Sequence, residues 1–315
     1  MFDVKQLRVL RAVAEHGSFS AAADALSYTQ PAISQQIAAL EKRAGTTLVD
    51  RGSRGVRLTD AGRALVAHAE VVLARLAAAE AELEAIAGIR GGRVRLSSFP
   101  TAGASLLPPA VAEFTRRHPD VELSFVEREP EEAAQMLRAA ELEIAILFEY
   151  DRLNPNEFER FYEGIELHHL VDDPMYLALP SGHPLVRKPR VRIKDVADET
   201  WIQESGTHSW CGHFHQTVCE AAGFTPKVGF QSDDYNVVQG LIAAGVGISL
   251  LPGLSLTNVR EDIVVRSLGR QAPARQITAG TLAGRYRSPA TDAMLKILSE
   301  VAERFELPSG AAIAA

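Results

Sequence analysis

The chain has 315 residues, of which 46% are hydrophobic and 23% charged, and its formal net charge is −7. This composition is ordinary for a globular protein, and the length allows two or three compact units. The absence of a long apolar run argues against a membrane span, and the absence of a basic start followed by an apolar core argues against a secretory signal. The two cysteines make no disulfide framework. We therefore expect a cytoplasmic protein that has no role at a membrane.

Three helices are predicted near the N-terminus. Apolar residues recur at helical spacing in the first thirteen residues. A second helix should begin at Ser18 or Ser20, polar residues that can cap it, and it continues into an alanine-rich run. A third helix should begin at Thr29 or Gln30, with Pro31 in its first turn, where the missing N–H has no intrahelical partner.

The third helix has one apolar and one polar face. Its apolar stripe consists of Ile33, Ile37 and Leu40. Its front end carries the polar residues Thr29, Gln30, Ser34 and Gln35. Short hydroxyl and amide side chains in this position suit base edges in the major groove. The layout predicts a helix-turn-helix that binds double-stranded DNA, and the alternative is an ordinary amphipathic helix pair with a polar outer face.

The residues after these helices favour DNA binding. Residues 45–59 predict a two-stranded wing with a basic tip. Residues 1–58 hold eight basic and five acidic side chains, a net charge of +3, so the remainder of the chain carries −10. A basic head on an acidic body suits phosphate binding at one end. Because +3 is modest, one copy should bind DNA weakly, and a dimer should bind more tightly.

This region resembles the LysR-type transcriptional regulators of bacteria. The matching residues are Phe19–Ala23, Leu26, Gln30–Ser34, Ile37, Leu40, Glu41, Leu48, Arg51 and Leu58–Gly62. The family usually has an aromatic residue where Val49 stands, so we expect altered packing of the wing without loss of function. DNA contacts are expected from Ser27, Thr29, Gln30, Pro31, Ser34, Gln35, Arg51 and Arg54. Gln30, Pro31, Ser34 and Gln35 would read base edges or nearby phosphates, and the two arginines would contact the backbone or the minor groove.

Residues 60–88 predict one long helix. Its apolar residues alternate at spacings of four and three: Leu65, Ala69, Val72, Leu76, Ala79, Leu83 and Ile86. This pattern implies pairing with a second helix, and the alternative is packing of the helix on its own domain. The resemblance to LysR-type regulators implies a homodimer through this helix and a homotetramer on DNA. The glycines at 88, 91 and 92 should end the helix in a hinge.

From residue 93 the pattern changes to alternating strands and helices. A first unit has expected strands at 94–97, 121–126 and 142–147, with helices at 106–117 and 131–140. A second set has expected strands at 166–170, 175–180, 201–202, 227–231, 247–251 and 276–282, with helices at 208–222, 235–244 and 289–305. Two such units predict parallel sheets covered by helices, with a ligand cleft between them.

The expected fold class is therefore α/β with a head rich in α-helix. The head is a winged helix-turn-helix (1–59), followed by a linker and dimerisation helix (60–90). The first lobe of the body is expected to contain residues 91–165 and 268–305, and the second lobe residues 166–267. Residues 306–315 are expected to form a disordered tail. The body resembles the effector domain of LysR-type regulators, which is similar to periplasmic binding proteins. Its landmarks are Leu106–Pro108, His118-Pro119, Glu143–Ile146, His183–Leu185, Ala222–Phe224 and Val246–Pro252.

A small-molecule effector of unknown identity is expected in the cleft. The candidate residues are Ser98, Phe99, Thr101, Glu129, Phe148, Gln203, Ser205 and Thr207. Hydroxyls and free N–H groups at a helix start suit an anion, and the resemblance implies that the loop around Ser98 contacts the effector, often through its carboxylate. Helix capping by Thr101 is the alternative that needs no ligand. Glu129, Phe148 and Glu204 could instead favour a cationic or aromatic effector.

Four residues on one helix face form an unusual set: His208, Cys211, His215 and Cys219. A soft metal, a redox pair of cysteines and plain core packing are the three alternatives, and core packing is favoured because Val218 and Ala222 share the face. We expect no metal and no cofactor. The remaining histidines suggest no catalytic group.

The prediction is a LysR-type transcriptional regulator that binds an interrupted palindrome and is modulated by a small-molecule effector. RNA polymerase is a possible further partner. The rival class is a solute-binding protein or an enzyme that uses the same cleft. The sequence shows no signal peptide, which a solute-binding protein would be expected to have. It also shows no nucleophile–base pair and no phosphate loop to support an enzyme. We therefore expect the chain not to be an enzyme.

Overall fold

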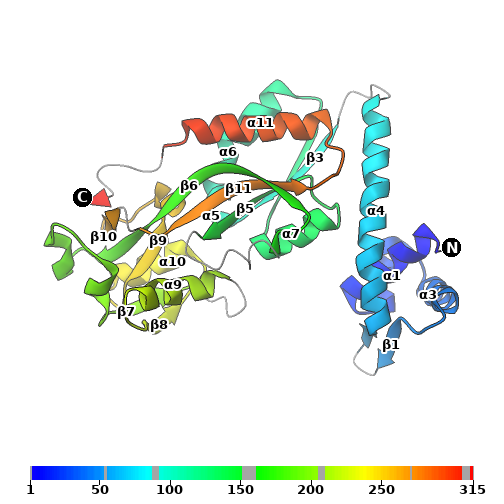
Figure 1. The fold of residues 1–315 in the computed structure, drawn as a ribbon, viewed down its shortest axis with the longest axis horizontal. Helices are drawn as coiled ribbons and strands as arrows, with labels where there is room; N and C mark the ends of the chain where they lie inside the picture. Colours follow the sequence, from blue (N-terminus) through cyan, green and yellow to red (C-terminus); the bar gives the residue numbers. More distant parts are fainter. Residues whose placement is uncertain are drawn as a thin grey trace.

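The computed structural model describes residues 2–52, 55–86, 92–150, 161–204, 210–269, 272–306 and 313–314. Figure 1 shows a small helical head and a larger α/β body, joined by one long helix, α4 (Asp60–Ile86). No helix within these ranges is long and apolar enough to cross a membrane. The helix-turn-helix head and the two-lobed α/β body confirm the expected fold class.

The head contains three helices and a two-stranded wing. They are α1 (Val4–His16), α2 (Phe19–Leu26), α3 (Gln30–Ala44), β1 (Val49–Gly52) and β2 (Gly55–Leu58). The side chain of Ser18 accepts a hydrogen bond from the N–H of Ala21 and caps α2. Thr29 is the N-cap of α3, and Pro31 lies in its first turn. The two predicted helix starts are therefore confirmed.

The apolar stripe of α3 forms the centre of the head. Its three residues, Ile33, Ile37 and Leu40, are fully buried. The next residue, Glu41, accepts hydrogen bonds from the N–H groups of Leu48 (2.8 Å) and Val49 (3.2 Å). This carboxylate holds the wing against α3. Val49 is itself buried in the same core.

Helix α4 is attached to the head by a close backbone contact. A Cβ atom on Gly62 would lie 2.1 Å from the carbonyl oxygen of Leu48, so only glycine lets α4 approach β1 this closely. Leu65 and Val66 pack against the head core, and Ala69 is fully buried. Further along, α4 turns apolar side chains outward: Val71, Val72, Leu76 and Leu83 are exposed. The single long helix was predicted to residue 88, and residues 87 and 88 lie outside the described ranges.

The first lobe of the body, lobe 1, is built on three parallel strands. They are β3 (Arg93–Ser98), β4 (Glu122–Glu127) and β5 (Ile144–Tyr150), with β3 in the middle. The helices are α5 (Pro100–Ala104), α6 (Leu107–Arg117), α7 (Pro130–Arg138) and α11 (Pro289–Arg304). Figure 1 shows α6 and α11 on one side of the sheet and α7 on the side that faces α4.

Two long strands connect the lobes, β6 (Ile165–Pro180) and β11 (Ala274–Leu282). The expectation of two separate strands at 166–170 and 175–180 is wrong, because β6 is continuous. Asp172, Asp173 and Pro174 resemble a turn in sequence, yet the carboxylate of Asp173 is paired with Arg275 on β11. Strand β6 pairs with β11 up to Pro174 and with lobe 2 strands from Met175 onward.

Lobe 2 contains the elements between β6 and β11. They are β7 (Thr200–Gln203), α9 (Trp210–Ala221), β8 (Lys227–Gln231), α10 (Tyr235–Ala243), β9 (Ser249–Pro252), the 3₁₀ helices η1 (Pro184–Arg187), η2 (Ile193–Val196) and η3 (Gly253–Thr257), and β10 (Ile263–Ser267). Strand β10 was not predicted. The tail was expected to be disordered from residue 306. Within it, Ile313–Ala314 form a short strand, β12, beside β10. Residues 307–312 and 315 lie outside the described ranges.

The close contact at Gly62 gives a testable prediction. Gly62→Ala should destabilise the head by about 1–3 kcal/mol, because a Cβ would collide with the backbone of Leu48. Gly240→Ala, in α10, is the matched control: nothing lies within 4 Å of its Cβ position. It should be neutral or stabilise by about 0.5–1 kcal/mol, since alanine favours a helix. Thermal unfolding followed by circular dichroism measures both, and a G62A protein as stable as wild type would contradict the prediction.

Candidate DNA-binding and effector sites

The polar side chains expected to face DNA gather around the front of α3. Ser27, Thr29, Gln30, Pro31 and Gln35 are exposed, and Ser34 is partly buried. The side chain of Thr29 makes no capping hydrogen bond to the helix. The front of α3 therefore presents hydroxyl and amide groups on a helix whose other face is fixed in the head core.

Tyr28 is a candidate that the sequence reasoning missed. Its side chain is 47% exposed, and its N–H donates to the carbonyl of Ala23 at 2.8 Å, which holds the turn before α3. Its position between Ser27 and Thr29, two residues that had been selected, was the available signal.

The two wing arginines are only partly placed. Strands β1 and β2 pair antiparallel, with Arg51 opposite Val56, so the predicted hairpin is present. The side chain of Arg51 and all of Arg54 lie outside the described part of the chain. Their contacts with DNA stay predictions.

In lobe 1, the expected effector loop follows β3. Ser98 and Phe99 are buried, and the Ser98 hydroxyl donates to the carbonyl of Phe99 at 3.1 Å. Phe99, not Thr101, is the N-cap of α5, so the alternative of capping by Thr101 does not describe this loop. The Thr101 hydroxyl instead accepts a hydrogen bond from Arg275 at 3.0 Å.

Arg275 forms a buried ion pair at the point where the lobes join. Its Nε and one terminal nitrogen donate to the same Asp173 oxygen, at 3.0 and 2.6 Å. The other oxygen of Asp173 accepts from the N–H of Leu254, in η3, at 2.9 Å. Burial by itself would lower the pKa of Arg275, but the facing carboxylate raises it well above its usual value. Burial raises the pKa of Asp173, and the facing Arg275 guanidinium and the N–H of Leu254 oppose that rise.

Two aromatic rings enclose this guanidinium. Phe99 and Phe148 meet edge to face, with centroids 4.8 Å apart. The central carbon of Arg275 lies 5.2 Å from the first ring and 4.9 Å from the second. Three of the predicted effector residues, Phe99, Thr101 and Phe148, therefore surround one arginine that sequence reasoning missed. The signal for it was a charged residue at the start of an apolar strand.

Glu129 and Glu204 bring the two lobes into electrostatic contact. Glu129 precedes α7, and its side chain keeps contact with solvent. The surrounding protein nevertheless raises the pKa of Glu129 to about 7, chiefly by desolvation and then by repulsion from Glu204 in lobe 2, while Arg275 opposes the rise. Glu204 itself accepts a hydrogen bond from the hydroxyl of Tyr235 at 2.6 Å.

The other predicted residues of lobe 2 are less completely placed. Gln203 is buried at the end of β7, and within the described ranges its side-chain nitrogen has no hydrogen-bond partner. Ser205 and Thr207 lie outside those ranges. The structure thus describes the lobe 1 part of the candidate site and Gln203 of lobe 2, and the role of all these residues in effector binding stays a prediction.

Comparison with protein families decides the identity of the chain. Residues 4–63 match the family "Bacterial regulatory helix-turn-helix protein, lysR family", and residues 87–303 match the "LysR substrate binding domain". The chain belongs to the LysR family of transcriptional regulators. The resemblance inferred from the sequence is confirmed. As a LysR-type regulator, the protein is a DNA-binding transcriptional regulator with an effector-binding domain, and it is not an enzyme.

Relatives and solved structures agree with this assignment. The chain is 31% identical to a hydrogen peroxide-inducible genes activator of Pectobacterium carotovorum, over 82% of this chain and 82% of that protein. A full-length OxyR variant from Pseudomonas aeruginosa has a TM-score of 0.70 at 21% identity, covering 96% of this chain and 95% of that one. Full-length CbnR in complex with its target DNA has a TM-score of 0.61 at 22% identity, covering 95% of this chain and 100% of that one.

Within this LysR-type chain, the histidine and cysteine set is only half described. His215 and Cys219 are buried, and Cys219 is a free thiol. Burial raises the pKa of Cys219 to about 12 and lowers the pKa of His215. His208 and the side chain of Cys211 lie outside the described residues. Among the residues that the structure describes, no group of three His, Cys, Asp or Glu could hold a metal. The two placed residues support core packing.

The raised pKa of Glu129 predicts a pH effect. Because the folded-state pKa of about 7 exceeds the ordinary value of 4.5, the contribution of this group to stability is fully present below 4.5 and is lost as the pH rises through 7. Glu129→Gln removes that loss. The melting temperature of E129Q relative to wild type should therefore rise between about pH 5 and about pH 8. Glu127→Gln, on the exposed strand β4, is the control. If the melting temperatures of wild type and E129Q depend on pH in the same way, the assignment is refuted.

Proposed function

We propose that the front of α3 enters the major groove and reads the operator. The contacts would come from Ser27, Thr29, Gln30, Pro31, Ser34 and Gln35, with Arg51 and Arg54 of the wing on the backbone or in the minor groove. The observation that carries this proposal is the exposed polar front of α3 on a helix whose stripe of Ile33, Ile37 and Leu40 is fully buried. A rigidly held helix keeps such groups in register with base edges.

We also propose that two copies pair through α4 and that two dimers assemble on DNA. Val72, Leu76 and Leu83 are 42%, 38% and 66% exposed and fall on one side of the helix at heptad spacing. An apolar stripe of this kind is usually covered by a partner. A dimer would place two α3 helices on an interrupted palindrome and double the modest charge of one head.

A small-molecule effector is proposed to bind where the lobes meet. Its contacts would be Ser98, Phe99, Thr101, Glu129, Phe148, Gln203, Ser205 and Thr207. Support comes from Arg275, which lies between Thr101 and the strands that join the lobes. The ligand would shift the angle between dimers only through its affinity difference between the two arrangements, and so change promoter occupancy and recruitment of RNA polymerase in the cytoplasm.

The proposed units are 1–59, 60–90, lobe 1 at 91–165 with 268–305, and lobe 2 at 166–267. The matched family ranges, 4–63 and 87–303, support a head and a body divided near these positions. The change of strand partners in β6 near Asp173 supports two lobes connected by shared strands.

Genomic-fragment capture tests the DNA-reading proposal. The wild-type protein should retain fragments that share an interrupted palindrome, including DNA upstream of its own gene. Ser34→Glu should lower this specific retention by at least about tenfold, because it places a carboxylate against the groove. Ala221→Glu, at the exposed end of α9 in lobe 2, adds the same charge far from the head and should leave retention unchanged. Equal specific retention by S34E and wild type would refute the role of α3.

The dimer proposal has its own test. Leu76→Glu should convert the protein to a monomer, or weaken self-association by at least about tenfold, because it puts a charge in the proposed apolar seam. Ala67→Glu is the matched control, since Ala67 is exposed on another side of α4. Analytical ultracentrifugation gives the mass of each variant. If L76E sediments with the same mass as wild type and A67E, the seam lies elsewhere.

A further inference from the structure

The DNA-binding head and α4 contact lobe 1 of the same chain at two defined points. A terminal nitrogen of Arg11, on α1, lies 3.7 Å from a carboxylate oxygen of Glu141, which follows α7. A terminal nitrogen of Arg75, on α4, donates to the carbonyl of Gly284 at 2.7 Å. Helix α4 also contacts α7, and Figure 1 shows these two helices next to each other.

Further charged groups lie near the contact between Arg11 and Glu141. Glu70 of α4 lies in the fields of Arg11, Glu141 and Arg138, so α1, α4 and α7 each contribute a charge, as does the loop after α7. Burial raises the pKa of Glu70, with repulsion from Glu141 acting in the same direction and the two arginines opposing it. Glu70 therefore lies near the Arg11–Glu141 pair, where α1, α4 and lobe 1 meet.

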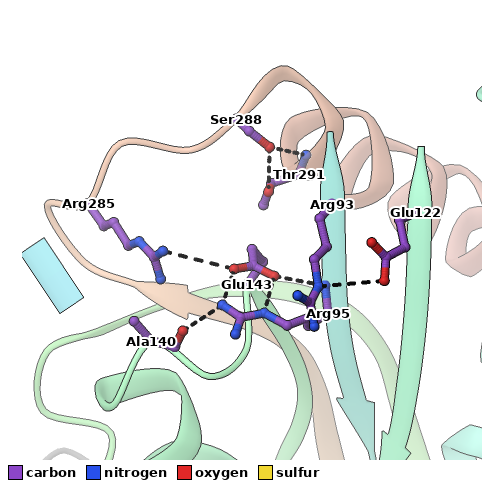
Figure 2. Close-up of polar contacts among 8 residues, drawn as sticks. All are labelled: Arg93, Arg95, Glu122, Ala140, Glu143, Arg285, Ser288 and Thr291. Atoms are coloured by element: carbon purple, nitrogen blue, oxygen red, sulfur yellow. Dashed lines mark hydrogen bonds and ion pairs between the residues drawn. The ribbon is translucent and has the colours of Figure 1, made fainter. Parts of the chain in front are cut away.

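Lobe 1 holds its part of this contact rigidly. Ala140 has a left-handed backbone (φ 56°), and its carbonyl accepts from Arg95 at 2.6 Å. Glu143 accepts from the Arg95 side chain at 2.7 and 3.1 Å and faces Arg285 at 3.9 Å. Figure 2 shows the side chains of Arg95, Glu143 and Arg285 converging, with Arg93 on the same strand as Arg95 and Glu122 on the neighbouring strand β4. Glu141 lies between Ala140 and Glu143 in the sequence, and its N–H donates to the carbonyl of Met136.

Strand β3, which carries Arg95, also reaches the candidate effector site. Arg95 lies in the first half of β3, and β3 ends at Ser98, three residues before Thr101. Strand β3 thus connects the loop that carries Glu141 with helix α5, which carries Thr101.

We propose that Glu141 and Gly284 form a docking surface on lobe 1 that holds the chain's own DNA-binding head and sets the direction in which α3 faces. Arg11 of the head and Arg75 of α4 are the groups that this surface receives. The consequence for operator spacing rests on the proposed dimer, whereas the docking itself does not.

Zero-length cross-linking tests the docking on the full-length protein. In an Arg11→Lys variant, a water-soluble carbodiimide should join position 11 to Glu141, and mass spectrometry would identify the linked peptides. Arg8→Lys, an exposed position on the same helix, should give no link to Glu141. R11K with Glu141→Gln should lose that link. Mixing isotopically labelled and unlabelled protein reports whether the link is within one chain.

A link between position 11 and Glu141 within one chain supports the docking. Its absence overturns the proposal, and so does a link found only between different copies, because the surface would then receive another molecule's head. These outcomes do not depend on DNA binding or on dimerisation, so failure of the proposed dimer cannot be mistaken for failure of the docking.

A charge reversal tests the consequence. Wild type should prefer one half-site spacing in a selection from operators of varied spacing. Arg11→Glu and Glu141→Arg should each reduce this preference by about twofold to fivefold, as expected for a partly exposed ion pair, and the double variant should restore it. Arg8→Glu controls for charge lost from α1. Unchanged preference in both single variants, or no recovery in the double variant, overturns the role in setting α3.

Discussion

The ion pair between Arg275 and Asp173, at the point where the lobes join, is the most deeply buried of those in the described part of the chain. Removing two charges from water costs several kcal/mol per ion, and such a pair persists only where good geometry and further hydrogen bonds compensate. Here the carboxylate receives donors from Arg275 and from the backbone of η3, while the guanidinium also donates to Thr101. The pair joins β6 and β11 where β6 changes its partners from lobe 1 to lobe 2, so it fixes how the lobes meet.

This pair also limits what can bind beside it. A ligand anion at Thr101 would compete with Asp173 for a guanidinium that is already matched and enclosed by Phe99 and Phe148. The carboxyls of Glu129 and Glu204 repel each other across the lobes, and the pKa of Glu129 rises to about 7 because of partial desolvation and this repulsion. A neutral or cationic ligand meets neither cost. Of the two effector chemistries that the sequence leaves open, the electrostatics of the site oppose the anionic one.

Local signals in the sequence predicted the head well because each of its elements is specified by near neighbours. Ser18 caps α2, Pro31 suits the first turn of α3, and the stripe from Ile33 to Leu40 follows a single period. The body depends on distant pairs, and there the prediction was weaker. Asp173 and Pro174 looked like a break in β6 because their partner, Arg275, lies 102 residues away. Of the candidate effector site, the sequence identified the loop after β3 but missed the arginine that Thr101 contacts.

A regulator of this kind has to convert a small change at the lobes into a change at DNA, and the described contacts provide a short physical connection. Strand β3 is buried between β4 and β5, and packed strands move as units rather than bending gradually. One end of β3 leads to Thr101 and the Arg275 pair, and its other half holds Glu143 and the carbonyl of Ala140 through Arg95. Glu141, between those two residues, faces the head. A shift of β3 would therefore displace the effector loop and the head contact together, without any change in the fold of either lobe.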